Sequence, residues 1–124
     1  MKISILVPVF NEENTVIQIL EKVNKQSNNN FSLEIIVIDD GSTDRSREFL
    51  SNRKDLYTRF IELDKNSGKG GAIKEGLKIA TGDYILFQDA DLEYEPNDYS
   101  KIFYAIEHFD AEVVIGSRNL SPQY

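Results

Sequence analysis

The sequence of 124 residues has no cysteine and a single histidine, His108. Disulfide scaffolds and thiolate zinc sites are therefore excluded, as is any site that needs several imidazoles. Apolar runs are short: the longest one near the N-terminus, Ile5–Val9, is far below the ~18 residues of a membrane span and lacks the flanks of a signal peptide. We therefore expect a cytoplasmic protein, and a peripheral contact with the cytoplasmic face of a membrane stays open.

Basic residues are also scarce, because 14 Lys and Arg stand against 21 Asp and Glu, a net charge of −7. A protein of this balance is not expected to bind nucleic acid through a basic face. Hydrophobic residues make up 40% and charged residues 28% of the chain, which is typical of a globular domain. The length fits a single domain with its own core, and we expect residues 1–124 to form it.

Apolar, β-branched runs alternate with helical patterns along the chain. Continuous runs of this length suit strands that are buried on both faces, as in a parallel sheet. The expected strands are Ile3–Val9, Glu34–Ile38, Phe60–Leu63, Tyr84–Phe87 and Glu112–Ile115. Helical spacing of apolar residues follows each of the first four runs, and Asn14-Thr15 and Thr43 or Asp44 are candidate caps of the first two helices. The alternation predicts an α/β fold: a doubly wound, mainly parallel sheet flanked by helices.

Polar side chains follow each of these runs, and sheets of this kind bind ligands outside the carboxyl ends of their strands. The sharpest group is Asp89-Ala90-Asp91, and Glu93 continues its spacing of two. Carboxylates at this spacing can point to one side, and their hard oxygens suit Mg²⁺ or Mn²⁺, which also take phosphate oxygens and waters. The alternative is a solvated acidic turn that caps the following helix.

Three further groups at strand ends are candidates for nucleotide binding. Residues 39–42, Asp-Asp-Gly-Ser, could accept hydrogen bonds from a nucleobase or ribose, or could simply form a turn. Residues 67–71, Ser-Gly-Lys-Gly-Gly, lack the spacing of a P-loop but open a helix whose N–H groups could bind an anion; close packing of the helix start is the alternative. Arg118 could bind a diphosphate or be an ordinary surface arginine.

Together these groups carry an ordered signature. In chain order it reads Val-Pro-Val-Phe-Asn-Glu-Glu at 7–13, Ile-Asp-Asp-Gly-Ser-Thr-Asp at 38–44, Asn-Ser-Gly-Lys-Gly-Gly-Ala at 66–72, Asp-Ala-Asp-Leu at 89–92 and Gly-Ser-Arg at 116–118. This order and spacing resemble family 2 glycosyltransferases with the GT-A fold, over about residues 3–119. Within that family the sequence most resembles the dolichyl- and polyprenyl-phosphate hexose (mannose or glucose) synthases.

The resemblance implies roles for individual residues. Pro8, Phe10 and Glu12 match the motif that sandwiches and hydrogen-bonds the nucleotide base, and Asp39 matches the carboxylate that reads the base or ribose. In the Asp-x-Asp pair the first carboxylate contacts the sugar or ribose and the second binds the metal, while Arg118 contacts a phosphate of the donor or acceptor. The residues expected to bind the nucleotide are Pro8, Phe10, Glu12, Asp39, Asp40, Lys69, Asp89, Ala90 and Asp91; the metal ligands are Asp89, Asp91 and Glu93; and the catalytic group is Asp89, Asp91 and Arg118. We expect Asp39, Asp89 and Arg118 to converge at one edge of the sheet.

The implied activity is a metal-assisted, inverting transfer of a hexose from a UDP- or GDP-sugar to an acceptor, expected to be a polyprenyl or dolichyl phosphate, as in the synthesis of cell-envelope glycans. After Gly-Ser-Arg these synthases usually continue with an aromatic residue and a Gly-Gly pair, whereas Asn119 and Leu120 follow here. Catalytic domains of the family also run on well beyond this length. We therefore expect a C-terminally truncated donor half, in which the parts that bind the acceptor and contact a membrane are missing.

Three alternatives compete with this interpretation. A signalling receiver domain would need its acidic pair after the first strand and a lysine after the fifth, where this chain has Asn11-Glu12 and Arg118. A nucleotidyltransferase would carry a glycine-rich, arginine-bearing loop after the first strand. A non-catalytic module derived from a glycosyltransferase, which binds a nucleotide or a partner chain, stays open.

Overall fold

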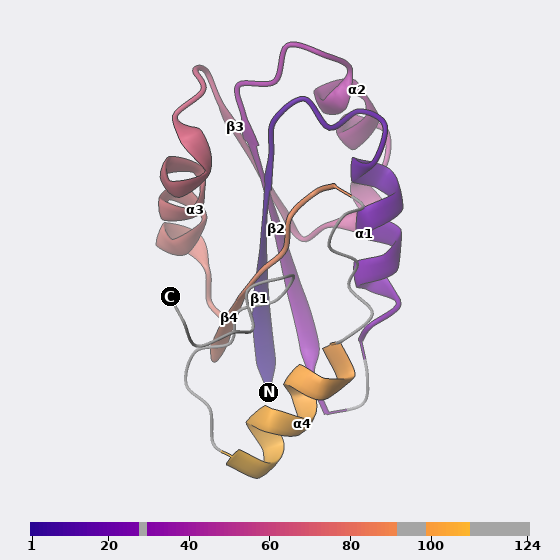
Figure 1. The fold of residues 1–124 in the computed structure, drawn as a ribbon, viewed down its shortest axis with the longest axis vertical. Helices are drawn as coiled ribbons and strands as arrows, with labels where there is room; N and C mark the ends of the chain where they lie inside the picture. Colours follow the sequence, from indigo (N-terminus) through magenta and orange to yellow (C-terminus); the bar gives the residue numbers. More distant parts are fainter. Residues whose placement is uncertain (28–29, 92–98, 110–124) are drawn as a thin grey trace.

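The computed structural model describes residues 1–27, 30–91 and 99–109 (Figure 1). The elements in chain order are β1 (Lys2–Val9), α1 (Val16–Asn24), β2 (Ser32–Asp40), α2 (Ser46–Ser51), the 3-10 helix η1 (Lys54–Leu56), β3 (Arg59–Leu63), α3 (Gly68–Ile79), β4 (Tyr84–Phe87) and α4 (Tyr99–Phe109). Four of the predicted strands are present at or near their expected bounds, and the fifth, expected at Glu112–Ile115, lies outside the described residues.

The strands form one sheet in the order β3-β2-β1-β4, and all neighbouring pairs are parallel. β1 is central: its Ile5 pairs with Ile35 of β2 on one side and with Leu86 of β4 on the other. Because all the strands run the same way, their carboxyl ends meet at one edge of the sheet, toward the top of Figure 1. The parallel α/β architecture predicted from the sequence is confirmed.

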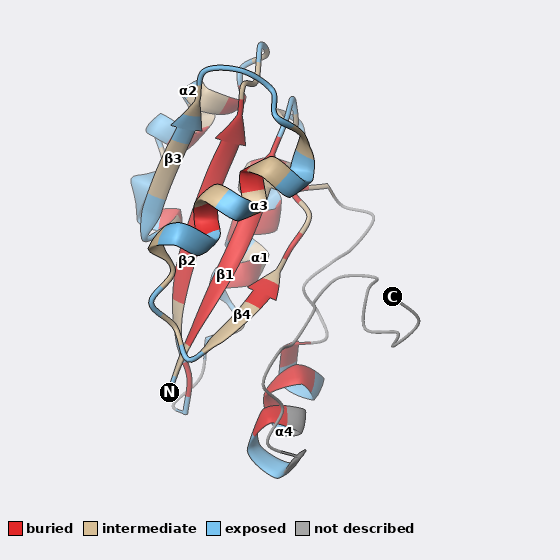
Figure 2. Cartoon of the chain, turned by 90° about the vertical axis from the view of Figure 1, so that its left-hand side faces the viewer, coloured by how far each residue is buried: buried red, intermediate tan, exposed pale blue. Residues whose placement is uncertain are grey.

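Helices cover both faces of the sheet: α3 lies on one side, and α1 and α2 lie on the other (Figure 1). Successive side chains of a strand point to opposite faces and so enter two different apolar clusters. Ile5 and Val7 of β1 join the cluster that contains residues of α1 and α4, whereas Leu6 joins the cluster under α3. The two inner strands, β1 and β2, are therefore buried on both faces along most of their length (Figure 2), which explains their continuous apolar sequences.

Helix α3 comes closest to the sheet at Gly76. A Cβ atom at this position would lie 2.9 Å from both Ile38 Cδ1 and Leu6 Cδ2, so a side chain there would force these two core side chains to shift. The helix ends at Ile79. The glycine thus lets α3 pack directly on Ile38 and Leu6 of the sheet.

The first helix begins differently from the prediction. Thr15 occupies the N-cap position of α1, but its side chain makes no capping hydrogen bond. Its hydroxyl instead donates to the carbonyl of Ala90 at 2.7 Å and to Glu12 Oε2 at 3.3 Å. The predicted N-cap position of Thr15 is thus confirmed, but the capping hydrogen bond is missing because a tertiary partner takes the hydroxyl. In α2 the N-cap position belongs to Arg45, one residue after the predicted Asp44, although Asp44 Oδ1 accepts a hydrogen bond from the N–H of Ser46, the first helical residue, at 2.8 Å.

Glu34 of β2 ties together the amino-terminal end of the sheet. Its carboxylate is only 4% exposed and accepts hydrogen bonds from Ser4 Oγ at 2.6 Å, from both the N–H and the hydroxyl of Thr81 at 2.8 Å, and from Arg59 Nε at 3.4 Å. Burial alone would raise the pKa of Glu34, but these donors outweigh it and lower the pKa to about 2. One carboxylate thus joins β1, β2, β3 and the turn between α3 and β4.

We predict that Glu34 makes the stability of the protein depend on acid pH. Because its folded pKa of about 2 lies below the ordinary 4.5, the ionised carboxylate stabilises the fold fully above about pH 4.5, and this contribution is lost as the pH falls toward 2. Glu34→Gln should lower the free energy of unfolding at neutral pH by about 2–3 kcal/mol and flatten its pH dependence in that window. Urea denaturation followed by circular dichroism measures both.

The matched control for this prediction is Glu48→Gln, which removes a carboxylate from an exposed ion pair with Arg45. Exposed pairs contribute little, so this variant should change the free energy of unfolding by less than about 0.5 kcal/mol. A Glu34→Gln protein that keeps the parent's acid profile would contradict the assigned role of Glu34.

Candidate functional site

A cavity of about 260 Å³ lies at the carboxyl ends of β1, β2 and β4, beside the start of α3. This is the edge at which open α/β sheets bind their ligands. Its lining residues come from four separate segments of the chain and are Pro8, Val9, Phe10, Glu12, Asp40, Asn66, Gly68, Lys69, Asp89, Ala90 and Asp91. The parallel sheet therefore brings strand-end residues that are distant in sequence into one site.

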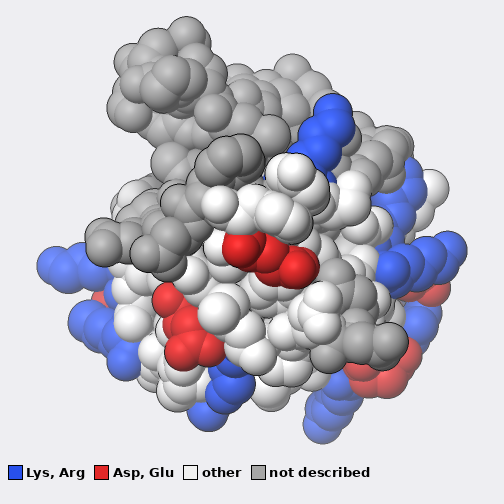
Figure 3. Space-filling model, turned by 90° about the horizontal axis from the view of Figure 1, so that it is seen from below, with Lys and Arg blue, Asp and Glu red and all other residues white. Residues whose placement is uncertain are grey.

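Apolar and acidic side chains meet in this cavity. Phe10 is an aromatic side chain left 44% exposed beside Pro8, which is unusual in a chain that buries most of its large apolar residues. The carboxylates of Glu12, Asp89 and Asp91 also line the cavity. The opposite end of the molecule carries acidic and basic side chains side by side (Figure 3). The cavity can thus offer an apolar platform and negative charge to the same ligand.

The acidic residues of the cavity influence one another. Burial is the largest cause that raises the pKa of Glu12, and the nearby negative charges of Asp91, Asp44 and Asp89 add to it, against a smaller opposing effect of the hydrogen bond from Thr15. The contribution of these charges to the raised pKa of Glu12 shows that its carboxylate lies in a region of negative electrostatic potential. A cation that entered the cavity would be attracted by it.

Asn11 ties the loop after β1 to the loop after β2. Its backbone has a positive φ of 52°, which asparagine tolerates better than most residues. In this conformation Asn11 Oδ1 accepts hydrogen bonds from the Thr43 N–H at 2.8 Å and the Asp44 N–H at 3.2 Å, and the Asn11 N–H donates to Ser42 Oγ at 2.9 Å. The segment that holds Phe10 and Glu12 is therefore fixed to the rest of the edge.

The two aspartates at the end of β2 point to opposite faces of the sheet. Asp40 lies on the α3 side, lines the cavity, and its Oδ1 accepts hydrogen bonds from the N–H and the hydroxyl of Ser67 at 2.8 and 2.9 Å. Asp39 lies on the α2 side, is completely buried, and does not line the cavity. Both end the same strand, but only Asp40 meets Asp89 in the cavity.

Asp39 is held by Arg47 of α2. The guanidinium forms an ion pair with Asp39 Oδ2 and a hydrogen bond to the carbonyl of Leu63, and the Ser42 N–H donates to the same carboxylate oxygen at 3.2 Å. The other oxygen, Oδ1, is buried and has no hydrogen-bond partner within the described residues. The carboxylate therefore depends strongly on the charge of Arg47.

Gly41 allows the turn after β2 to pass close to the loop after β3. Its φ is 77°, and a Cβ atom there would lie only 2.7 Å from the backbone nitrogen of Asn66. Both the conformation and the space thus require glycine. The close approach brings Asn66 and Ser67 to the rim of the cavity next to Asp40.

The donor set suits a magnesium or manganese ion best when a ligand completes it. Asp89 and Asp91 offer hard carboxylate oxygens, but the described residues contain no cluster of three or more metal-ligating side chains. Mg²⁺ commonly takes one or two carboxylates and fills its other positions with phosphate oxygens and water. The residues therefore fit an ion that binds together with a phosphorylated ligand.

Most of the predicted site residues come together, namely Pro8, Phe10, Glu12, Asp40, Lys69, Asp89, Ala90 and Asp91. Asp39 stays apart from them, and Glu93 and Arg118 lie outside the described residues. Val9, Asn66 and Gly68 also line the cavity. They lie within the sequence motifs, and Gly68 within the candidate loop 67–71, but none of the three was assigned an individual role. No sequence pattern pointed to Arg47, whose role depends on tertiary packing against Asp39.

Comparison with known proteins places this site in a family. The family described as Glycosyl transferase family 2 matches residues 4–123. The chain belongs to this family. The match covers nearly the whole chain, including all the elements that line the cavity.

Individual relatives agree with this membership. The dolichyl-phosphate beta-glucosyltransferase of Dictyostelium discoideum is 35% identical over 130 residues, covering 94% of this chain and 40% of that protein. Residues 1–349 of Staphylococcus aureus TarS, solved in complex with UDP-GlcNAc, give a TM-score of 0.73 at 28% identity over 86% of this chain and 31% of that one. The mannosyltransferase PcManGT from Pyrobaculum calidifontis, solved with GDP-Man and Mn²⁺, gives 0.72 at 25% identity over 90% and 33%.

These relatives establish the GT-A fold for the chain and its resemblance to hexosyltransferases. The chain spans about two fifths of the Dictyostelium protein and about a third of each of the two solved chains. Within residues 1–27, 30–91 and 99–109, no helix is both long and apolar enough to cross a membrane.

We predict that the ion pair of Arg47 with Asp39 stabilises the fold. Arg47→Met would leave a buried carboxylate without its cation, so the free energy of unfolding should fall by about 3 kcal/mol. The double variant Arg47→Met/Asp39→Asn removes the stranded charge as well and should recover part of this loss. Urea denaturation measures both. Arg45→Met, which affects an exposed pair with Glu48, should cost less than about 1 kcal/mol, and an equal loss in that control would argue against the assignment.

Proposed function

We propose that the cavity is the donor site of a glycosyltransferase that moves a hexose from a nucleoside diphosphate sugar to a lipid phosphate. The observation that carries this proposal is the meeting, in one cavity of a family 2 chain, of the exposed Phe10, the anchored Asp40 and the pair Asp89 and Asp91. These groups suit two parts of such a donor: the flat base and the charged diphosphate.

We assign the nucleobase to the side of the cavity formed by Pro8, Phe10 and Asp40. An aromatic ring offers the face of a base a stacking surface. Ser67 donates both of its hydrogen bonds to Asp40 Oδ1, which leaves the second carboxylate oxygen as an acceptor. An acceptor there favours bases with a ring N–H, as in uracil and guanine. Asp39, which the resemblance matched to this role, is fully buried against Arg47, and we therefore give the role to Asp40.

We assign the diphosphate to the side of Asp89 and Asp91, with a bound Mg²⁺ or Mn²⁺. A metal held there would act as a Lewis acid that stabilises the departing nucleoside diphosphate. Asp91 and Asp89 would hold it, and Glu93 and Arg118 remain proposed as a further ligand and a phosphate contact. In support, the related PcManGT was solved with GDP-Man and Mn²⁺.

We propose a polyprenyl or dolichyl phosphate as the acceptor, and an inverting reaction. The support is the name of the Dictyostelium relative, a dolichyl-phosphate glucosyltransferase. A phosphate oxygen is already anionic, so it can attack the sugar without a strong base. The direct assay is transfer of labelled hexose from UDP- or GDP-sugar to polyprenyl phosphate in detergent, and the donor site itself is tested by the two binding predictions that follow.

We predict that Asp91→Asn removes the metal dependence of nucleotide binding. Calorimetric titration of the parent with UDP- and GDP-sugars should give at least about tenfold tighter binding with Mn²⁺ than without it, since one charge-assisted contact is worth about 1.5–3 kcal/mol. In Asp91→Asn the two titrations should agree. Asp64→Asn changes an exposed aspartate that follows β3 outside this cavity and should behave as the parent. Equal metal dependence in Asp91→Asn and the parent would rule out the assigned ligand.

We also predict that Asp40 reads the base. Asp40→Asn can keep the hydrogen bonds from Ser67 through its amide oxygen, but it then presents an NH₂ group in place of the second carboxylate oxygen. Affinity for the preferred nucleoside diphosphate should fall about tenfold, because a donor now meets the ring N–H. Competition binding with uridine, guanosine and cytidine diphosphates measures this. Unchanged affinity and unchanged base preference would overturn the assignment.

A further inference from the structure

Lys69 is the only basic side chain that lines the cavity within the described part of the chain. It is the second residue of α3, and its ammonium forms an ion pair with the carboxylate of Asp89. The Asp89 side chain is 14% exposed, whereas the Lys69 side chain is 58% exposed. The acid is therefore held in place at the end of β4, while the lysine reaches it from outside and is free to move.

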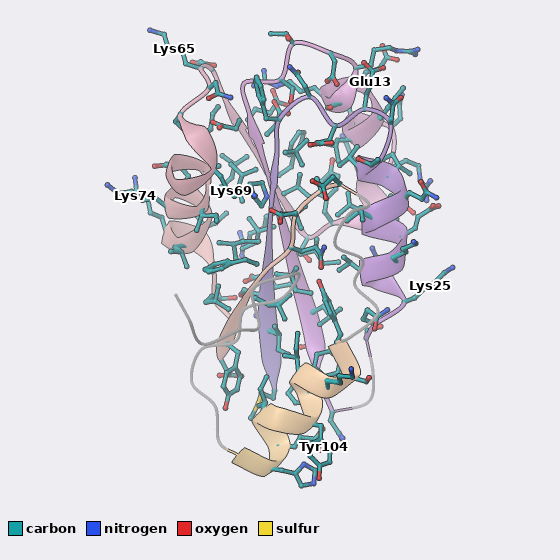
Figure 4. The ribbon with its side chains drawn as sticks, viewed as in Figure 1. Glu13, Lys25, Lys65, Lys69, Lys74 and Tyr104 are labelled. Atoms are coloured by element: carbon teal, nitrogen blue, oxygen red, sulfur yellow. The ribbon has the colours of Figure 1, made fainter. Side chains whose placement is uncertain are left out.

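The position of Lys69 in its helix is unfavourable by itself. The first turn of a helix carries partial positive charge, so a cation there is repelled and an anion is preferred. Figure 4 shows Lys69 pointing from α3 toward the strands, whereas Lys74, also on α3, points away from the sheet. The ion pair with Asp89 offsets this unfavourable position.

We propose that Lys69 is the internal counter-ion of Asp89, which a divalent cation displaces and which then moves to the diphosphate of the nucleotide. This inference rests on the proposed donor site and adds a mechanism of coupling to it. A metal ion that binds Asp89 would have to replace the Lys69 ammonium, which now neutralises this carboxylate. If both contacted Asp89 at once, the two positive charges would repel each other. The diphosphate offers the displaced ammonium new anionic oxygens within reach of a flexible side chain.

The turn around Lys69 connects the two halves of the site. Two residues earlier, Ser67 is bound to Asp40 through its N–H and hydroxyl, while Lys69 is bound to Asp89. The start of α3 is therefore anchored to the end of β2 on the base side and to the segment after β4 on the metal side. The lysine needs to swing only its own side chain to exchange Asp89 for a diphosphate, because Ser67 keeps the backbone in place.

This arrangement makes metal and nucleotide binding depend on each other. Without nucleotide, Lys69 competes with the metal and weakens its binding; with nucleotide, the lysine has another partner and the competition ends. Such coupling is reciprocal, so the metal must strengthen nucleotide binding by the same factor. Removing the ammonium should therefore strengthen one binding event and weaken the other, which loss of a merely structural contact would not do.

The test compares the parent 124-residue chain with Lys69→Met, which keeps the length of the side chain and removes its charge. Free Mn²⁺ is measured by electron paramagnetic resonance in titrations without nucleotide, and UDP and GDP binding is measured by calorimetry in saturating Mn²⁺. Lys69→Met should bind Mn²⁺ alone about three- to tenfold more tightly than the parent, and the nucleoside diphosphate about tenfold more weakly. Lys69→Arg keeps the charge and should stay near the parent in both titrations.

Lys74→Met is the matched control, because it removes a lysine from the same helix outside the cavity, and it should leave both titrations unchanged. If Lys69→Met binds Mn²⁺ alone no more tightly than the parent, or if neither protein binds Mn²⁺ alone, the counter-ion proposal is overturned. Nucleotide binding by the parent would then still support the donor site. If the parent binds neither UDP nor GDP, the proposed function fails, and the Mn²⁺ titrations still decide whether Lys69 competes for Asp89.

Discussion

The parallel pairing of β1 between β2 and β4 is the constraint on which the rest of the molecule depends. Because of this pairing, all the strands end at one edge of the sheet. The register decides which residues lie side by side at that edge. Val9 pairs with Asp39, so the residues that follow them, Phe10 and Asp40, lie next to each other at the end of the two strands. A central strand buried on both faces cannot slip by one residue without reversing every side chain between the two apolar clusters. The register, and with it the cavity, is therefore fixed by the core.

Gathering carboxylates at one edge has an electrostatic cost, and four of these acids have separate partners that offset it. Asp39 has Arg47, Asp40 has the N–H and hydroxyl of Ser67, Asp89 has Lys69, and Glu12 has the hydroxyl of Thr15. These partners differ in kind. The arginine pair is buried and holds the fold together, whereas the lysine pair is exposed on the cationic side and can be exchanged for a ligand. The same chemistry thus stabilises the fold on one face and, in the function we propose, serves binding on the other.

Asp39 and Asp40 also show that two adjacent residues of one strand can have different roles. Successive side chains of β2 point to opposite faces, so one aspartate enters the helical layer of α2 and the other enters the cavity beside α3. Glu34, nearer the start of the same strand, lies at the other end of the sheet and joins three strands and a turn. The buried Glu34 and Asp39 therefore act as fixed connections near the two ends of β2. Asp40 is the acid of this strand that lines the cavity.

The sequence by itself determined the α/β class, the strands and helices of the described region, and the edge at which the polar residues gather. These follow from local properties: continuous apolar runs, helical spacing and the polar residues that end each run. The family was also evident from five short motifs in order. Only the tertiary structure decided which acids face the cavity, because a continuous apolar strand such as β2 gives no alternation from which to tell its two faces apart. It also decided the partners of three polar side chains: Thr15 meets Ala90, Asp39 meets Arg47, and Asp89 meets Lys69. No sequence pattern links the members of these pairs. They meet only because α1, α2 and α3 pack on the sheet.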